Sequence, residues 1–153
     1  CSTLRGNVPT RLRKLEEENF DGIILAAAGL KRLGLLEQDT YEYTFLAPEE
    51  FIPAGGQGLM AVEAKAGTAA HSLAQAMDHA QGRLCLDLER SVLKQLDAGC
   101  HEPIGIYSVL QNEQLEVWGI SSPREEVKRI HLTGGTSRRD IEKLASEAWK
   151  GLM

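Results

Sequence analysis

Apolar positions follow two different patterns along this chain, and the first pattern is that of buried strands. Residues 21–29 (DGIILAAAG) form a continuous apolar run without alternation, which is typical of a strand covered on both faces. Residues 2–8 predict a short strand before a turn, and residues 51–66 predict a glycine-rich turn followed by another strand. These three strands are expected to lie in one sheet.

Helical patterns separate these strands. Residues 9–20 predict a helix with Asn7 as its cap, Pro9 in its first turn, and Leu12 and Leu15 facing inward. A shorter helix is expected over residues 30–36. Alternation of strands and helices predicts a parallel α/β sheet, but this part of the chain supplies only half of a usual α/β domain. Such a sheet would keep an open edge, which predicts self-association.

The second pattern begins near residue 70 and predicts helices around an antiparallel sheet. Helices are expected over residues 70–81, over 83–99 and over 136–153, and the last has a weak capping box from Ser137 and Asp140. Three strand-like runs with polar turns lie between the last two helices: residues 103–110, 114–120 and 126–132. The inward faces of the two long helices are predicted to be Leu84, Leu88, Val92 and Leu96 in one, and Ile141, Leu144, Ala148 and Leu152 in the other. The fold class is therefore α/β followed by a small α-βββ-α domain.

Charge and composition exclude several classes of protein. The chain has 153 residues and a formal net charge of -5, which argues against a general nucleic-acid or membrane-surface binder. No apolar run approaches the roughly 18 residues that a membrane span needs. Basic residues concentrate at the start, because residues 1–34 hold six Lys and Arg against four Asp and Glu. The basic residues at the start of the chain are therefore candidate ligand-binding groups.

Three arginines lie where a parallel sheet would place an anion. Arg5 ends the first predicted strand, Arg11 lies in the first turns of the next helix, and Arg32 follows the second strand. Ligands of parallel α/β sheets bind beyond the carboxyl ends of strands, and arginine binds carboxylate or phosphate through a planar fork. The alternative is a solvated helix face on which Arg11, Arg13 and Lys14 pair with the glutamates at 16–18.

The three cysteines are too few and too scattered for a disulfide framework, so a reducing compartment such as the cytoplasm is expected. Cys85 falls in an apolar helical stripe and is predicted to be a core residue. Cys100 directly follows Gly99, on the bend between a helix and a strand. It is either a nucleophile or attachment point, or a small buried loop residue. The four histidines have no metal-ligand spacing and are expected to be surface or structural residues, and no metal site is predicted.

Four motifs in order resemble the porphobilinogen deaminase (hydroxymethylbilane synthase) family. They are LRGNVPTRLRKL at 4–15, DGIILAAAGLKRLG at 21–34, PAGGQGLMAVEAK at 53–65 and LERSVLKQLDAGCHEPIG at 88–105. The resemblance implies a transferase of tetrapyrrole (haem) biosynthesis, which joins four porphobilinogen molecules into hydroxymethylbilane and releases ammonia. It also implies a dipyrromethane cofactor, bound through a thioether to Cys100 in the full-length enzyme and expected to be absent from this chain alone.

The same resemblance assigns the other site residues. Arg5, Arg11 and Arg32 would bind the acetate and propionate groups of cofactor and substrate. The remaining residues expected at this cleft are Asn7, Thr10, Ala28, Gly29 and, near the tethered cofactor, Gln57. No aspartate matches the family's catalytic aspartate, which is expected upstream of residue 1 together with the missing N-terminal half of the enzyme.

We therefore expect the C-terminal half of the enzyme, inactive by itself. Residues 1–53 would be the end of a domain that resembles periplasmic binding proteins, 54–76 a hinge and return to the first domain, and 77–153 the domain with the cofactor cysteine. Two alternatives remain. A free-standing anion-binding module would bind carboxylates reversibly and without Cys100, and a structural remnant would bind no ligand.

Overall fold

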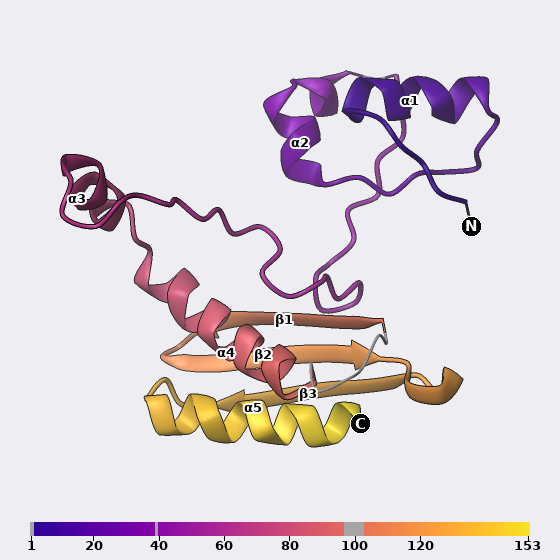
Figure 1. Cartoon of the computed structure of the whole chain (residues 1–153). Coiled ribbons are helices and arrows are strands. Elements are labelled where there is room, and N and C mark those ends of the chain that lie inside the picture. The colour runs from indigo at the N-terminus through magenta and orange to yellow at the C-terminus, as the bar shows by residue number, and fades with distance from the viewer. Residues whose placement is uncertain (1, 39, 97–102) are drawn as a thin grey trace. The chain divides into compact units, whose positions relative to one another are not determined.

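The computed structural model describes residues 2–38, 40–96 and 103–153 (Figure 1). The chain divides into two compact units, residues 1–46 and residues 47–153. The first unit contains helices α1 (Val8–Glu17) and α2 (Ala27–Arg32) and the 3-10 turn η1 (Leu35–Glu37). The second contains helices α3 (Ala69–Ala76), α4 (Ala80–Leu96) and α5 (Arg138–Leu152), strands β1 (Ile104–Gln111), β2 (Gln114–Ser121) and β3 (Lys128–Gly134), and the 3-10 turn η2 (Pro123–Glu125).

Helix α1 forms as its sequence predicts. The side chain of Asn7 accepts a hydrogen bond from the Thr10 amide and caps the helix, and a proline occupies its first turn. Leu12 is buried and Leu15 is half-buried, so the predicted inward face is confirmed. Helix α1 buries Leu12 and helix α2 buries Leu30, which leaves this unit with a small core.

The parallel sheet predicted for the first 66 residues is not formed in the described part of the chain. Residues 2–5, 22–26 and 59–65 carry neither helix nor strand, and α2 begins inside the run that was expected to be a strand. A strand needs hydrogen-bonded neighbours, and the described residues supply none to these segments. Several of their apolar side chains are accordingly exposed, with Ile24 at 67% and Met60 at 80%. The strand prediction for these three segments is therefore wrong for this structure.

The antiparallel sheet of the second unit is as predicted. Its order is β1-β2-β3, and each strand pairs antiparallel with the next. Helices α4 and α5 lie against the same face of this sheet, where α4 contacts β1, α5 contacts β3, and the two helices contact each other (Figure 1). The layout from α4 to the end of α5 is therefore an α-βββ-α unit, and with the helices of the first unit the described chain has an α+β fold.

The core of the second unit lies between the sheet and these two helices. Helix α5 buries all four residues expected on its inward face, and Ser137 caps it by accepting a hydrogen bond from the Asp140 amide. Leu88 and Val92 of α4 are fully buried. Alternate residues of β1 and β2 complete the core from the sheet side, where Ile106, Leu115 and Val117 are each fully buried.

The outer edge of β1 is covered. The amides of Ile106 and Ser108 are two residues apart and therefore point to the same edge, away from β2. The Ile106 amide donates to the carbonyl of Pro53 at 2.8 Å, and the Ser108 amide donates to the carboxylate of Glu89 at 2.9 Å. These two groups stand where a further strand would pair, so this stretch of the edge is closed to strand addition.

Candidate functional site

The start of helix α1 gathers several of the predicted site residues. The Asn7 side-chain oxygen accepts hydrogen bonds from the Thr10 amide at 3.0 Å and from the Thr10 hydroxyl at 2.6 Å. The Arg11 guanidinium donates through Nε to the carbonyl of Gly6 at 2.7 Å. Gly6 has φ of +128°, and a Cβ there would lie 2.9 Å from the Thr10 methyl group. Hydrogen bonds and close packing thus connect the backbone turn before α1 to the first turn of α1.

This arrangement leaves polar groups for a ligand. Only Nε of Arg11 is used by Gly6, so its terminal nitrogens face no partner among the described contacts. Arg11 is half-buried, whereas Arg5 and Arg32 are exposed. Among the ion pairs of the described residues, none includes Arg5, Arg11 or Arg32. Guanidinium groups without carboxylate partners suit the binding of an anionic ligand.

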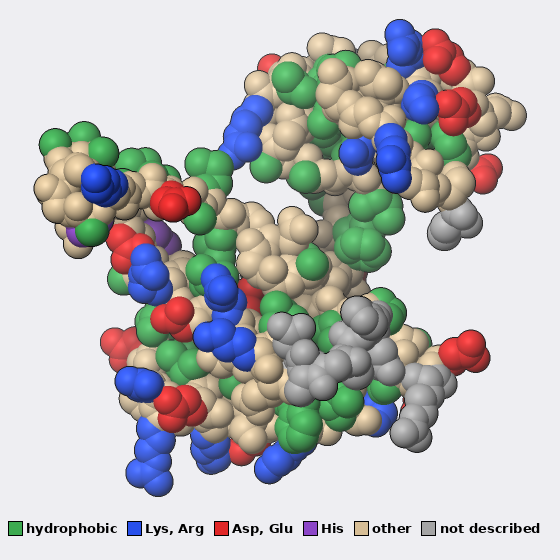
Figure 2. Space-filling model, viewed as in Figure 1, with side chains coloured by type: hydrophobic (Ala, Val, Ile, Leu, Met, Phe, Trp, Pro, Cys, Tyr) green, Lys and Arg blue, Asp and Glu red, His purple; other side chains and the backbone are tan. Residues whose placement is uncertain are grey.

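The alternative, a solvated face of paired charges, holds for a different part of the same helix. Arg13 pairs with Glu17 at 3.4 Å and Lys14 pairs with Glu18 at 3.3 Å, both at the spacing of one helical turn. Basic and acidic side chains accordingly lie next to each other on the surface of α1 (Figure 2). Two basic residues of this helix, Arg13 and Lys14, therefore pair with glutamates of the same helix or its C-cap. Arg11 instead bonds to the carbonyl of Gly6.

Helix α2 brings one further site residue to this place. Gly29 lies in its first turn, and a Cβ there would be 3.6 Å from a methyl group of Val8, the first residue of α1. Ala28 is its exposed neighbour. Arg32 lies at the other end of α2, and the described contacts do not join it to the start of α1. The structure thus brings together Gly29 and the residues at the start of α1, and not Arg32.

The segment after η1 also packs on helix α1. A hydrogen bond with Glu16 raises the pKa of the Tyr41 hydroxyl. The Tyr43 hydroxyl donates to the carbonyl of Leu35 at 3.1 Å, and the two tyrosine rings meet edge to face at 6.4 Å. These contacts join residues 41–43 to helix α1 and to the turn η1.

Gln57 belongs to the second unit and lies in the predicted glycine-rich turn. Residues 55–58 form turns, and the Gln57 amide donates to the carbonyl of Ala54 at 3.2 Å. Its side chain is exposed. The sequence prediction of a tight turn here is confirmed, although the strand expected after it is not formed.

The two cysteines with separate predictions have different outcomes. Cys100 falls within 97–102 and lies outside the described residues. Cys85 is a free thiol that packs against the core from α4, as predicted. Burial raises the pKa of the Cys85 thiol, so it is a poor nucleophile at neutral pH.

Two of the described histidines, His79 and His131, have side-chain contacts with their neighbours. His79 precedes α4, and its Nδ1 accepts a hydrogen bond from the Gly82 amide at 3.0 Å. His131 lies on the sheet beside Trp118. In the part of the chain that the structure describes, no group of three or more His, Cys, Asp and Glu residues could hold a metal ion.

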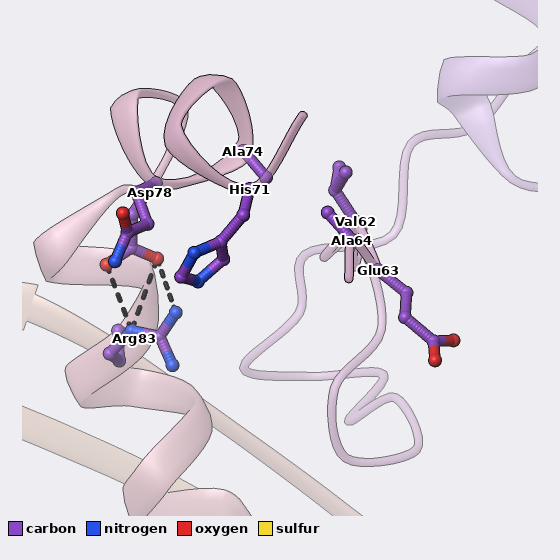
Figure 3. Close-up of a pocket in the computed structure, with 8 residues that line it drawn as sticks. Val62, Glu63, Ala64, His71, Ala74, Asp78 and Arg83 are labelled. Carbon is purple, nitrogen blue, oxygen red and sulfur yellow. Dashed lines mark hydrogen bonds and ion pairs between the residues drawn. The ribbon is translucent and has the colours of Figure 1, made fainter. Parts of the chain in front are cut away.

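A cavity of about 610 Å³ lies beside the junction of α3 and α4 (Figure 3). Asp78 and Arg83 form a bidentate pair on its wall, with Nε 3.0 Å from Oδ2, and the imidazole of His71 points into the space beside them. The guanidinium is therefore already shared with a carboxylate. The residues that line the cavity are Val62, Glu63, Ala64, His71, Ala74, Gln75, Asp78 and Arg83.

Glu89 is a buried charged residue that the sequence analysis did not single out. It is 5% exposed and lies on α4 between Cys85 and Leu93, one turn from each. Its spacing in the sequence could have indicated this, because it places a charged residue in an apolar helical stripe. A charge in that position is rarely buried unless it is paired or hydrogen-bonded.

Comparison with known families identifies the chain. The model described as "Porphobilinogen deaminase, dipyromethane cofactor binding domain" matches residues 1–72. The model described as "Porphobilinogen deaminase, C-terminal domain" matches residues 83–149. The chain belongs to the porphobilinogen deaminase family. The first match contains the start of α1 and its arginines, and the second contains the sheet with most of the two helices that pack on it.

Curated porphobilinogen deaminases are similar over most of this chain. The one from Clostridium kluyveri is 46% identical over 117 residues, which is 76% of this chain and 39% of that protein. The one from Chromobacterium violaceum is 46% identical over 118 residues, 76% of this chain and 37% of that protein. The one from Clostridium botulinum strain Loch Maree is 35% identical over 141 residues, 92% of this chain and 47% of that protein. The chain thus spans less than half the length of the porphobilinogen deaminases it matches.

Among the helices of the described residues, none is long and apolar enough to cross a membrane.

Proposed function

We propose that this chain is the carboxylate-binding and cofactor-carrying part of a porphobilinogen deaminase, which makes hydroxymethylbilane from four porphobilinogen molecules with release of ammonia. The observation that supports this most directly is the set of three arginines without carboxylate partners in the region matched by the cofactor-binding model. Each pyrrole of porphobilinogen bears two carboxylates, so a growing chain accumulates anionic groups that guanidinium forks bind well.

The residues at the start of α1 would act as one binding element. Arg11 would present its terminal nitrogens to a carboxylate, held in place by its bond to Gly6. The Asn7 amide nitrogen and nearby backbone would contribute further donors, and the N-terminus of α1 favours an anion. Ala28 and Gly29, which lack large side chains, would let a pyrrole ring approach the backbone. Arg5 and Arg32 would hold other carboxylates of the same ligand.

Cys100 would carry the dipyrromethane through a thioether, in a segment between α4 and β1. When bound, this cofactor supplies the pyrrole carbon to which the first substrate is joined. The thioether requires no permanently ionised thiol, so the unfavourable position after a helix C-terminus is compatible with attachment. Gln57 would lie near the cofactor.

The general acid of the reaction would come from another part of the enzyme. Asp78, which is exposed, is already engaged by Arg83 and lies beside a cavity in the second unit. We infer that the family's catalytic aspartate is supplied by the N-terminal half, as a partner of this chain. The chain alone is then expected to lack the tethered cofactor and to show no turnover.

The domain assignment follows the same proposal. Residues 1–53 would complete a domain like those of periplasmic binding proteins, 54–76 would return to the first domain, and 77–153 would form the third. The exposed apolar side chains at Met60 and Val62, 80% and 56% exposed, fit a segment that pairs as a strand with the rest of the enzyme. Self-association through such unpaired segments is the competing outcome, and the cytoplasm is the expected compartment.

Intact mass spectrometry tests the proposal. The purified chain is measured before and after incubation with hydroxymethylbilane, both alone and with the N-terminal half of a porphobilinogen deaminase, and Cys100→Ser is the control. With both halves present, the thiol is expected to displace the terminal hydroxyl of hydroxymethylbilane as water. The mass then rises by the four pyrrole units of the tetrapyrrole less one water, and this gain should disappear in the control. An unmodified mass in every sample would overturn the assignment of Cys100.

Reversible binding separates the second candidate, a free-standing anion-binding module. That candidate is favoured if hydroxymethylbilane binds to the wild type and to Cys100→Ser equally but is lost in Arg11→Ala. If neither substitution changes any property except stability, the chain is a structural remnant.

A further inference from the structure

We propose that Glu89 is the positioning residue of the glycine-rich turn that carries Gln57. The carboxylate of Glu89 joins three parts of the second unit that are distant in sequence: the turn at 55–58, helix α4 and strand β1. This inference rests on the proposed function only for the role of Gln57. The position of Glu89 itself stands on the hydrogen bonds described below.

Both oxygens of the carboxylate are used. Oε2 accepts a hydrogen bond from the Gly56 amide at 2.7 Å. Oε1 accepts hydrogen bonds from the Ser108 amide and the Ser108 hydroxyl, each at 2.9 Å. The Ser108 hydroxyl is also 3.2 Å from the carbonyl of Cys85, one turn before Glu89 on α4. Glu89 therefore supplies an acceptor to each of two backbone amides that secondary structure leaves unpaired.

The turn that Glu89 holds is pressed against α4 and β1. A Cβ at Gly55 would lie 2.7 Å from side-chain atoms of both Ile106 and Leu93. Gly56 has φ of +78°, a left-handed conformation that glycine adopts without cost. The neighbouring Pro53 carbonyl accepts the Ile106 amide at 2.8 Å. The backbone before the turn thus bonds to β1, and the Gly56 amide of the turn has the buried carboxylate of Glu89 as its acceptor.

The need of the turn for a hydrogen-bond acceptor explains a carboxylate at position 89, whereas packing in the core would favour an apolar side chain. Burial of a charge is costly, and an apolar residue at position 89 would continue the stripe of Cys85 and Leu93. An apolar side chain would leave the amides of Gly56 and Ser108 without acceptors, however, and a buried unsatisfied amide destabilises its local structure. The Glu89 side chain therefore fixes the backbone directly before Gln57, and it also closes the edge of β1 through its contact with Ser108.

Glu89→Gln is a sharp probe of this role because it keeps the size of the side chain. The amide oxygen of glutamine can serve both donors of Ser108, whereas its nitrogen would then face the Gly56 amide, donor against donor. Val92→Ala is the matched control, since Val92 is a fully buried residue on the same helix and its truncation lowers global stability without touching the turn.

Amide hydrogen exchange, followed residue by residue by NMR on the whole chain, distinguishes local from global opening. In Glu89→Gln, exchange at Gly56 is expected to accelerate at least about tenfold more than exchange at the core amide of Val117. In Val92→Ala the two amides should accelerate together. Equal acceleration at Gly56 and Val117 in both variants would overturn the proposal, as would full protection of Gly56 in Glu89→Gln.

The link to the proposed function is tested in the mass experiment with both halves present. Slower gain of the tetrapyrrole mass in Glu89→Gln than in Val92→Ala is expected. Equal rates in the two variants would show that the turn does not matter for attachment. If the wild type itself is never modified, the proposed function fails, while the exchange at Gly56 still decides whether Glu89 holds the turn.

Discussion

The imidazole of His131 lies flat against the indole of Trp118, with ring centroids 4.5 Å apart and planes inclined by 9°. The two residues are direct partners in the register of β2 and β3. Tyr107 of β1 continues the row, stacked on the other side of Trp118 at 5.8 Å. Nε2 of His131 also lies 3.1 Å from the Glu116 carboxylate. The row crosses all three strands on the sheet face opposite α4 and α5.

We predict that His131→Ala lowers the free energy of unfolding by about 0.5–1.5 kcal/mol, because it removes a stacked aromatic partner. Trp118 fluorescence should change in the folded state, since its ring loses its closest neighbour. Urea unfolding followed by fluorescence measures both. Thr133→Ala, two residues along the same exposed face, is the control. A loss as large in the control would mean that strand propensity, not stacking, is responsible.

Asn7→Ala should destabilise helix α1 by about 1 kcal/mol, because the helix loses its N-cap. Asn7→Ser should retain most of the stability, since a hydroxyl can accept the same hydrogen bond from the Thr10 amide. Amide exchange at Leu12 reports α1 directly. Unchanged exchange in Asn7→Ala would show that the cap does not hold this helix.

The turn between β1 and β2 predicts a stabilising substitution. Asn112 and Glu113 have φ of 49° and 62°, which is the left-handed pair of a two-residue hairpin turn. Glycine at the second position is free of the left-handed penalty, so Glu113→Gly should add about 1 kcal/mol to the free energy of unfolding. Gln114→Gly, one residue into β2, should instead destabilise by about 0.5–1 kcal/mol. Thermal unfolding of the two variants checks the opposite signs.

The elements of the second unit were predicted well from the sequence because each helix and strand packs against other elements of the same segment. Ile141, Leu144, Ala148 and Leu152 recur at helical spacing, and all four are buried against strands that the same segment supplies. Local pattern and final packing agree there. The prediction of strands in the first 66 residues was wrong because such strands need partners from elsewhere. A run such as 21–29 requires neighbouring strands that the described residues do not provide.

The candidate site was predictable in kind but not in detail. The arginines were visible as basic residues after predicted strand ends, yet the sequence could not show that Arg11 turns back to Gly6 while Arg13 and Lys14 pair locally. Glu89 was missed because its partners, Gly56 and Ser108, are 33 and 19 residues away. Contacts between distant backbone amides and one side chain leave little pattern in a single sequence.

Cys85 should be slow to react with alkylating reagents. Burial raises the pKa of its thiol, so less thiolate is present at neutral pH than for an ordinary cysteine. In a chain with Cys1→Ser and Cys100→Ser, iodoacetamide labelling at pH 7 is expected to be at least several-fold slower than that of free cysteine. The rate should approach that of free cysteine in denaturant. Fast labelling of the native chain would contradict the packing of Cys85 against the core.

Acid should weaken the start of helix α4 through Asp78. The hydrogen bond from Arg83 holds the pKa of the Asp78 carboxyl below its ordinary value. The unfolded chain therefore binds this proton more tightly, and the stabilisation is fully present above the ordinary pKa, near 4, and is lost as the pH falls through the lowered value. Asp78→Asn should lower stability at neutral pH, and its difference from the wild type should shrink below about pH 4. Thermal unfolding between pH 7 and the acid limit of folding measures this, with Asp87→Asn on the same helix as the control. A difference that persists unchanged into acid would show that the pair stabilises the helix through geometry alone, without its charge.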